Sequence, residues 1–347
     1  MEMFTYCAQN AVLALQDQDH YVWDCSVIYA EGKYHMFSSH WDKKLGFGWN
    51  WVFNSRIIHC VADKPQGPYK FLREVLPLRV VLPRRGRQYF DGMNTHNTCV
   101  RYYDGKYYLY YMGTTYAGPI PTGEETSPEY NLEVWNKKRI GVAVADSIYG
   151  EFVRQDQPLL EPRDCSFWDC TVTTNPAVAI LPGGKTYLVY KSRRCAGAAL
   201  QLGVAVADKP DGQFHRLTDD PILQFDHPDI HVEDPYLWYD EKRKKFCILA
   251  KDDSKNGHFG ITGEWGCGFY AESDDCIHFT IPENPKVYSR KVTWKDGSVT
   301  QQGNMERPWI LPDENGEPAW LFCASGKGPH PYSFEGETFI VAQEMKR

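Results

Sequence analysis

Four carboxylic acids stand at or just before the first strand of a repeated hairpin pattern: Asp24, Asp169, Glu233 and Glu306. Carboxylates that a fold brings together raise one another's pKa, so that one tends to hold a proton near neutral pH while another is ionised. A protonated acid that faces an ionised base is the arrangement that cleaves glycosidic bonds. The sequence therefore predicts acid–base chemistry, provided that the fold brings these distant residues together.

A second set of polar and aromatic residues lies at the same positions of the pattern and is predicted to bind substrate. The set is Trp23, His40, Trp41, Asp91, His96, Asn97, Asn175, Lys191, Arg193, Asp234, Lys251, Glu306 and Arg307. The tryptophans are suited to stacking on a sugar ring, and Asp91 to binding sugar hydroxyls. The cations either form ion pairs with the four acids, which would then be structural, or bind an anionic sugar or phosphate. No spacing in this set is typical of a metal site.

The elements that must position these residues are β-hairpins, because one alternating pattern recurs five times. The copies are WDCSVIYAEGKYHMFSSH (23–40), HNTCVRYYDGKYYLYYMGTT (96–115), TNPAVAILPGGKTYLVYKSR (174–193), EDPYLWYDEKRKKFCILAKDD (233–253) and ERPWILPDENGEPAWLFCASG (306–326). Gly, Asp and Asn separate two alternating runs in most copies, as in a hairpin turn. A third strand and a short fourth strand follow each hairpin, except at the C-terminus, where the last copy is reduced to TFIVAQEMK.

Five four-stranded units predict an all-β fold, a five-bladed β-propeller, as a single domain over residues 1–347. A β-sandwich array and a β-helix explain the five in-register copies less well. The blade-opening strands are expected near residues 23, 96, 174, 233 and 306. Because the last unit is incomplete, we expect residues 3–15 to add its missing strand, so that the N- and C-terminal segments close the ring.

The insertion 116–138 interrupts the second unit and is long enough to be a lid over the site or a contact with a neighbouring subunit.

The site itself is expected on the propeller axis. The first strand of each blade lines the central channel, and the second strand returns to the same face. Residues at the start of the first strands and at the end of the second strands should therefore meet in one funnel.

Composition excludes several other classes of protein. With 38 Lys and Arg against 45 Asp and Glu, the net charge of −7 argues against nucleic-acid binding. No apolar run reaches the length of a membrane span. The 11 cysteines form no C-x-x-C pair, which favours free thiols and a cytoplasmic location, or a periplasmic or secreted one if a signal peptide has been removed. A homo-oligomer is compatible with these data.

The blade openings WDCSVI, HNTCV, NPAVAI, EDPYLW and ERPWIL resemble those of five-bladed propeller glycoside hydrolases, such as families 43, 62 and 117, without deciding among them. The resemblance implies that Asp24 is the general base and Glu233 the general acid of an inverting reaction. The third carboxylate of this pattern falls on Asn175, and Asp169 is the nearby candidate to tune the pKa of the acid. Glu306 and Arg307 have no clear counterpart and are expected to bind sugar hydroxyls or a sugar carboxylate.

These observations together predict an exo-acting, inverting glycoside hydrolase that cleaves short oligosaccharides, since a funnel without an appended binding module suits chain ends. No cofactor is required, although a structural divalent cation would fit the central channel. Two alternatives stay open. The Lys and Arg residues are compatible with a glycoside phosphorylase of the propeller type, and the same funnel would serve a non-catalytic carbohydrate-binding propeller.

Overall fold

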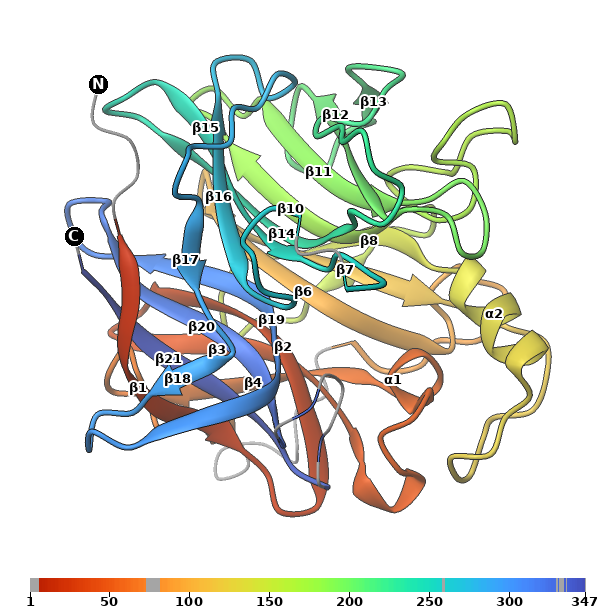
Figure 1. Cartoon of the computed structure of the whole chain (residues 1–347). Helices are drawn as coiled ribbons and strands as arrows, with labels where there is room; N and C mark the ends of the chain where they lie inside the picture. The colour runs from red at the N-terminus through yellow and green to blue at the C-terminus, as the bar shows by residue number, and fades with distance from the viewer. Residues whose placement is uncertain are drawn as a thin grey trace.

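The chain forms five antiparallel sheets arranged in a ring, a five-bladed β-propeller (Figure 1). This computed structural model describes residues 6–72, 82–257, 260–328, 330, 334 and 336–346. The predicted fold class is confirmed, and each predicted opening strand is present. Within the described ranges, no helix is both long and apolar enough to cross a bilayer.

The blades follow the chain in order, and each of the first four contains four strands. Blade one contains β2 (His20–Ala30), β3 (Lys33–Asp42), β4 (Arg56–Ala62) and β5 (Lys70–Phe71). Blade two contains β6 (Asn94–Tyr103), β7 (Lys106–Thr114), β8 (Arg139–Ala145) and β9 (Val153–Arg154). Blade three contains β10 (Thr174–Ile180), β11 (Thr186–Ser192), β12 (Gln201–Ala207) and β13 (His215–Arg216). Blade four contains β14 (Val232–Asp240), β15 (Lys245–Asp252), β16 (Gly268–Ser273) and β17 (Lys286–Tyr288).

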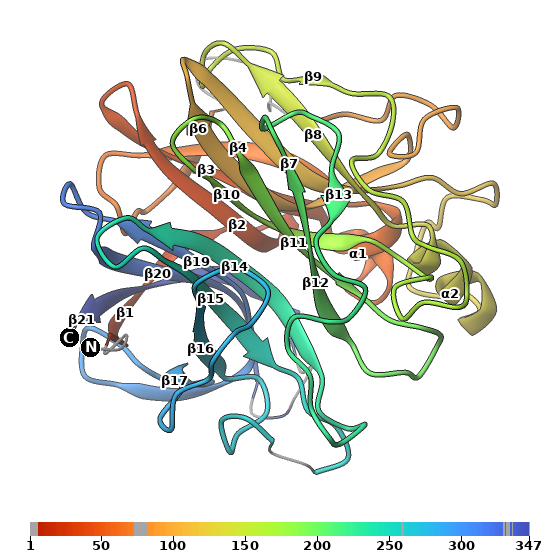
Figure 2. The same ribbon diagram turned by 90° about the horizontal axis from the view of Figure 1, so that it is seen from above.

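Blade five closes the ring with strands from both ends of the chain. It contains β18 (Lys291–Thr293), β19 (Val299–Pro312), β20 (Pro318–Lys327), β21 (Thr338–Lys346) and β1 (Cys7–Gln16). Strand β1 pairs antiparallel with β21, from Cys7 opposite Lys346 to Gln16 opposite Phe339. The first and last strands of the chain therefore lie side by side (Figure 2). The predicted closure by the N-terminal segment is confirmed, with the strand at 7–16 rather than 3–15; residues 3–5 lie outside the described residues.

Every blade-opening strand carries a bulge at the same place, and one residue there has a positive φ. These residues are Asp24 (40°), Asn97 (57°), Asn175 (55°), Asp234 (53°) and Arg307 (56°). The strand pairing shifts register at each of these positions. Asn and Asp tolerate the left-handed region better than most residues, which accounts for four of the five. A bulge re-aims its side chain, so the repeat directs five side chains toward the axis.

The insertion 116–138 packs against its own chain rather than standing free. It contains α2 (Pro128–Asn136), whose first turn is capped by Ser127. Its loop carbonyls at Pro121 and Gly123 accept hydrogen bonds of 3.1 Å from side-chain amides beside α1 (Asn50–Phe53). Figure 1 places α1 and α2 at the same side of the molecule, where the short 3₁₀ turn η1 (Lys43–Leu45) precedes α1. The two segments therefore pack against each other beside blades one and two.

Candidate active site

A cavity of about 730 Å³ lies at the end of the channel where the bulges and strand starts meet. This volume is within the range of small-molecule sites. The cavity is lined by Tyr21, Trp23, Phe47, Gly48, Trp49, Trp51, His96, Asn97, Glu124, Trp135, Lys138, Asn175, Lys191, Glu233, Asp234, Asn304, Glu306, Arg307, Phe334 and Gly336. Nine of the predicted site residues are in this set, from Trp23 in blade one to Arg307 in blade five. The funnel predicted from the repeat therefore exists.

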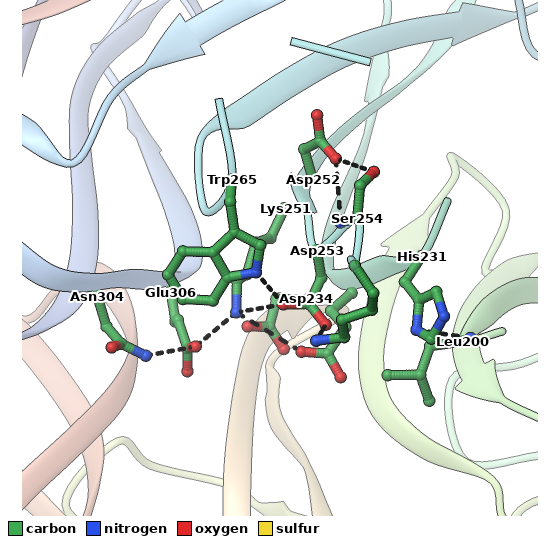
Figure 3. Close-up of polar contacts among 12 residues, drawn as sticks. Leu200, His231, Asp234, Lys251, Asp252, Asp253, Ser254, Trp265, Asn304 and Glu306 are labelled. Atoms are coloured by element: carbon green, nitrogen blue, oxygen red, sulfur yellow. Dashed lines mark hydrogen bonds and ion pairs between the residues drawn. The ribbon is translucent and has the colours of Figure 1, made fainter. Parts of the chain in front are cut away.

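Two of the lining carboxylates share one ammonium group. Lys251 Nζ lies 2.6 Å from Glu306 Oε1 and 3.7 Å from Glu233 Oε2. Figure 3 shows this lysine between Glu306 and Asp253, whose Oδ1 is 3.1 Å from Nζ. The Asn304 side-chain amide donates to Glu306 Oε1 over 2.7 Å, which fixes that carboxylate from the other side.

The pKa values of these two carboxyl groups move in opposite directions. Burial opposes the ionisation of Glu233, but Lys191 and Lys251 outweigh it and hold its pKa well below the usual range. The closest of these contacts joins Lys191 Nζ and Glu233 Oε1 at 2.7 Å. Burial raises the pKa of Glu306, and the charges of Asp234 and Glu233 raise it further against the opposing effect of Lys251. One cavity thus presents a carboxylate whose ionised form is stabilised and a second carboxyl group whose ionisation is opposed.

The floor of the cavity is a chain of side-chain hydrogen bonds between blades. Asn97 Nδ2 donates to Asn175 Oδ1 over 2.9 Å, and Asn175 Nδ2 donates to Asp234 Oδ1 over 2.6 Å. Arg307 continues the chain with an ion pair of 3.2 Å to Asp234. An amide accepts from one neighbour and donates to the next, whereas an ionised carboxylate can only accept, which explains why residue 175 is Asn here rather than the aspartate of the related pattern.

Asp24 is part of the same ring of bulges, but its carboxylate is buried beneath the cavity. It accepts hydrogen bonds from Ser39 Oγ (2.8 Å) and from the backbone amides of Asn97 (3.0 Å) and Thr98 (3.4 Å). Burial raises its pKa to about 6 despite Arg307 and these donors. Its link to the cavity is His96, whose Nε2 lies 3.3 Å from Oδ2. Asp24 itself is not among the lining residues.

Asp169 does not lie where a residue that tunes the acid would have to be. Its side chain is fully buried away from the cavity, paired with Arg163 and Arg216 at 2.6 Å each. Tyr190 also donates to it over 2.8 Å. Burial opposes ionisation, but these donors lower the pKa of Asp169 overall, and its carboxylate joins the loop before blade three to β11 and β13. The proposed catalytic role is not supported by this position.

Asp91 has the same surroundings in blade two, where two arginines and a tyrosine hold its buried carboxylate. It is therefore not placed to bind sugar hydroxyls. It pairs with Arg85 at 2.7 Å and Arg154 at 3.3 Å, and it accepts a hydrogen bond of 2.7 Å from Tyr111. The sequence contained a signal for this duplication, since an arginine precedes an aromatic-Asp pair by the same spacing in RGRQYFD (85–91) and RDCSFWD (163–169). Equal spacing of opposite charges indicates a repeated structural ion pair rather than a site.

Four other predicted binding residues are not among the lining residues of the cavity. His40 and Trp41 are buried in blade one, where Trp41 packs on Phe47 with ring centroids 5.2 Å apart. Lys251 is buried and acts on the site through the two glutamates. Arg193 lies outside the lining, over the ring of Trp135 at 3.8 Å.

Most of the aromatic wall of the cavity was not predicted from the sequence. Trp49 and Trp51 stack with centroids 6.2 Å apart, and Trp135 and Lys138 come from the end of the insertion. The available signal was the run FGWNWVF (47–53), whose aromatic density exceeds what a connecting loop needs. In the described part of the chain, no group of three or more His, Cys, Asp or Glu side chains is arranged to hold a metal ion.

Comparison with known proteins gives a partial match in sequence. No family model matches the chain. A β-xylosidase of Xylanibacter ruminicola is 29% identical over 174 residues, which are 46% of this chain and 48% of the relative. The match therefore spans about half the length of this curated relative.

Solved structures match over nearly the whole chain. The structure of BT0996 in an RGII complex gives a TM-score of 0.68 at 12% identity, over 98% of this chain and 91% of that protein. Zg3597, a family 117 glycoside hydrolase of the marine bacterium Zobellia galactanivorans, gives 0.65 at 17% identity, over 98% and 90%. Glycoside hydrolases of families 43 and 62 match as well. The likeness establishes the five-bladed fold and confirms the resemblance stated from the sequence.

Proposed function

We propose that this protein is a glycoside hydrolase that removes sugars from the ends of short oligosaccharides, with Glu306 as the general acid and Glu233 as the ionised carboxylate opposite it. The observation that carries the proposal is the pair itself. Both side chains line one cavity, both contact Lys251, and their pKa values are shifted in opposite directions. Two titratable groups that are driven apart in this way take the acid and base roles of a glycosidase.

The spacing favours a reaction with retention of configuration, unlike the inversion expected from the sequence. Lys251 Nζ contacts Glu306 at 2.6 Å and Glu233 at 3.7 Å. The distance between the nearest oxygens of these two carboxylates therefore cannot exceed the sum of the two contacts. Inverting enzymes need about 6.5–9.5 Å between the carboxyl groups to hold a water, whereas retaining enzymes have about 5–5.5 Å.

In this scheme Glu306 donates its proton to the glycosidic oxygen as the bond from that oxygen to the anomeric carbon breaks. Glu233 forms an ester with the anomeric carbon. Water then attacks the same carbon, Glu306 takes up the proton of that water, and Glu233 leaves as a carboxylate. Protons and bonds balance, and both groups return to their starting state.

The exo mode is supported by the closed floor of the cavity. Directly below the ring of bulges the channel narrows to a void of about 10 Å³, which is lined by Cys25, Thr98 and Trp309 among others. No chain can pass through such a space, so the end of an oligosaccharide has to enter from the open face. The indole rings of the wall are suited to stacking on that terminal sugar.

A second assignment keeps Asp24 as general base in an inverting reaction. It is favoured by the pKa of about 6, which suits a base near neutral pH, and by the contact of Asp24 with His96. It requires a water to reach a carboxylate that is fully buried and already has three donors.

Product analysis by NMR on an oligosaccharide panel tests both assignments. Retention of configuration, with turnover lost in Glu306→Gln and Glu233→Gln, is the expected result. Inversion, with turnover lost in Asp24→Asn and kept in Glu306→Gln, would select the second assignment. Cleavage that requires phosphate would identify a phosphorylase, and sugar binding without cleavage a binding propeller.

A further inference from the structure

The cavity wall contains a buried lysine that makes no ion pair with an acid in the described part of the chain. Lys138 is 1% exposed and lines the cavity directly after α2. Its Nζ lies 3.6 Å from the ring centroid of Trp135 and 5.1 Å from that of Trp51. Among the residues that the structure describes, it has neither an ion pair nor a side-chain hydrogen bond. A cation–π contact offsets only part of the cost of desolvating an ammonium ion.

A second cation near Trp135 is also incompletely satisfied. The Arg193 guanidinium lies 3.8 Å from the ring centroid of Trp135, and its buried Nε has no hydrogen-bond partner within the described ranges. Lys191 lies two residues before Arg193, at the end of β11, although it already contacts Glu233. Lys251 and Arg307, which the sequence offered as further anion ligands, are committed to Glu306 and Asp234.

From this arrangement we infer that Lys138, with Lys191 and Arg193 beside it, forms a subsite for an oxyanion carried by the substrate, in the first instance the carboxylate of a sugar acid. An oxyanion there would supply the missing partner of the buried ammonium. The tryptophans that surround Lys138 would meanwhile contact the sugar ring. The inference rests on the proposed function only in that the cavity takes a sugar.

The burial of Lys138 implies that anion binding is coupled to proton uptake, which can be measured. Burial, and next the charge of Lys191, place the pKa of Lys138 well below its usual value in the free protein. An anion beside the ammonium raises that pKa again, so binding takes up a proton wherever the pH lies between the two values. The affinity for the anion should therefore fall as the pH rises through that window.

Isothermal titration calorimetry with D-galacturonate and D-glucuronate tests the subsite, with their methyl esters as matched neutral ligands. We expect the wild type to prefer an acid over its ester at least tenfold and to take up protons on binding. Lys138→Met should abolish both effects, whereas Lys138→Arg should retain much of the preference. The matched control is Lys137→Met, which removes the same charge from the exposed neighbour and should change neither.

Two further experiments identify which oxyanion binds and control for misfolding of the variant. Inorganic phosphate or sulfate that binds in place of the sugar acids, with the same dependence on Lys138, would support the oxyanion site and assign it to those ions. If Lys138→Met loses its melting transition, Arg193→Gln serves as the second variant and should weaken the preference for the acid.

Equal binding of acid and ester by the wild type, with no binding of phosphate or sulfate, would overturn the inference. An unchanged preference in a folded Lys138→Met protein would do so as well. Failure of the proposed function looks different, because anion binding that depends on Lys138 would then persist in a protein that cleaves no glycoside.

Discussion

Asn175 in blade three donates its side-chain amide to Asp234 in blade four over 2.6 Å, at the floor of the cavity. Both residues have the left-handed backbone of the repeated bulge, with φ of 55° and 53°. The same amide group accepts from Asn97 on its other side. The floor is thus held by a side chain that links three blades.

Asn175→Asp should destabilise the protein at neutral pH and much less in acid. The new carboxylate faces Asp234 and cannot donate to it, so two like charges meet in a buried place. Loss of the hydrogen bond alone costs about 1–3 kcal/mol. Because at least one of the paired carboxyl groups then has a raised pKa, the missing stability should return as the pH falls. Thermal unfolding from pH 4 to 8 measures this, and Asn175→Ala, which adds no charge, should show little of the pH dependence.

Glu306→Gln should lower kcat/KM on natural glycosides by about 10²–10⁴-fold, since an amide cannot supply the proton that the leaving oxygen needs. Aryl glycosides with acidic phenol leaving groups need little protonation and should lose far less. Steady-state kinetics on both substrate types tests the assignment. An equal loss on both would contradict a role for Glu306 as the general acid.

The pH profile of kcat/KM should be wide, because the two carboxyl groups are shifted apart. Activity requires Glu233 ionised and Glu306 protonated. The acidic limb should therefore lie below the ordinary pKa of a glutamate and the basic limb above it. Activity should fall as the pH rises through the raised pKa of Glu306. Weakening the counter-charge with Lys191→Met should move the acidic limb upward, and an unmoved limb would argue against control by Glu233.

Asp24→Asn should flatten the pH dependence of stability between about pH 4 and 7. The pKa of Asp24 is raised from 3.8 to about 6, so the fold favours its protonated form. That contribution is fully present below the ordinary pKa and is lost as the pH rises through about 6; two pKa units correspond to at most about 3 kcal/mol. Urea unfolding at pH 4, 5, 6 and 7 compares the two proteins. Parallel curves would show that Asp24 is not the group responsible.

Asp169→Asn should reduce stability by about 3–5 kcal/mol while the folded protein keeps its turnover number. The change leaves Arg163 and Arg216 without the carboxylate that they share. Asp91→Asn removes the equivalent ion pairs of blade two and should behave in the same way. Activity per folded molecule, taken from active-site titration or a correction for the folded fraction, separates this outcome from a catalytic role, which would lower turnover without unfolding.

The sequence by itself determined the five blades, their opening strands and the closure of the ring. These features depend on local signals, namely the alternation of apolar residues and the turn residues between strands. It also placed Glu233, Glu306, Asn175 and Arg307 at one end of the channel, because equal register in equal blades implies equal position.

Only the tertiary structure decided which of the acids face the cavity. Asp91 and Asp169 are directed away from it in part by arginines of distant strands, Arg154 and Arg216. The nearby arginines leave a local spacing signal, but the pairing with these distant ones leaves none. Lys138 was invisible for the same reason, since its burial depends on Trp51 from another loop as well as on Trp135 nearby. The pKa of a carboxyl group follows from such non-local neighbours, so the division of roles between Glu233 and Glu306 becomes visible only once the chain is folded.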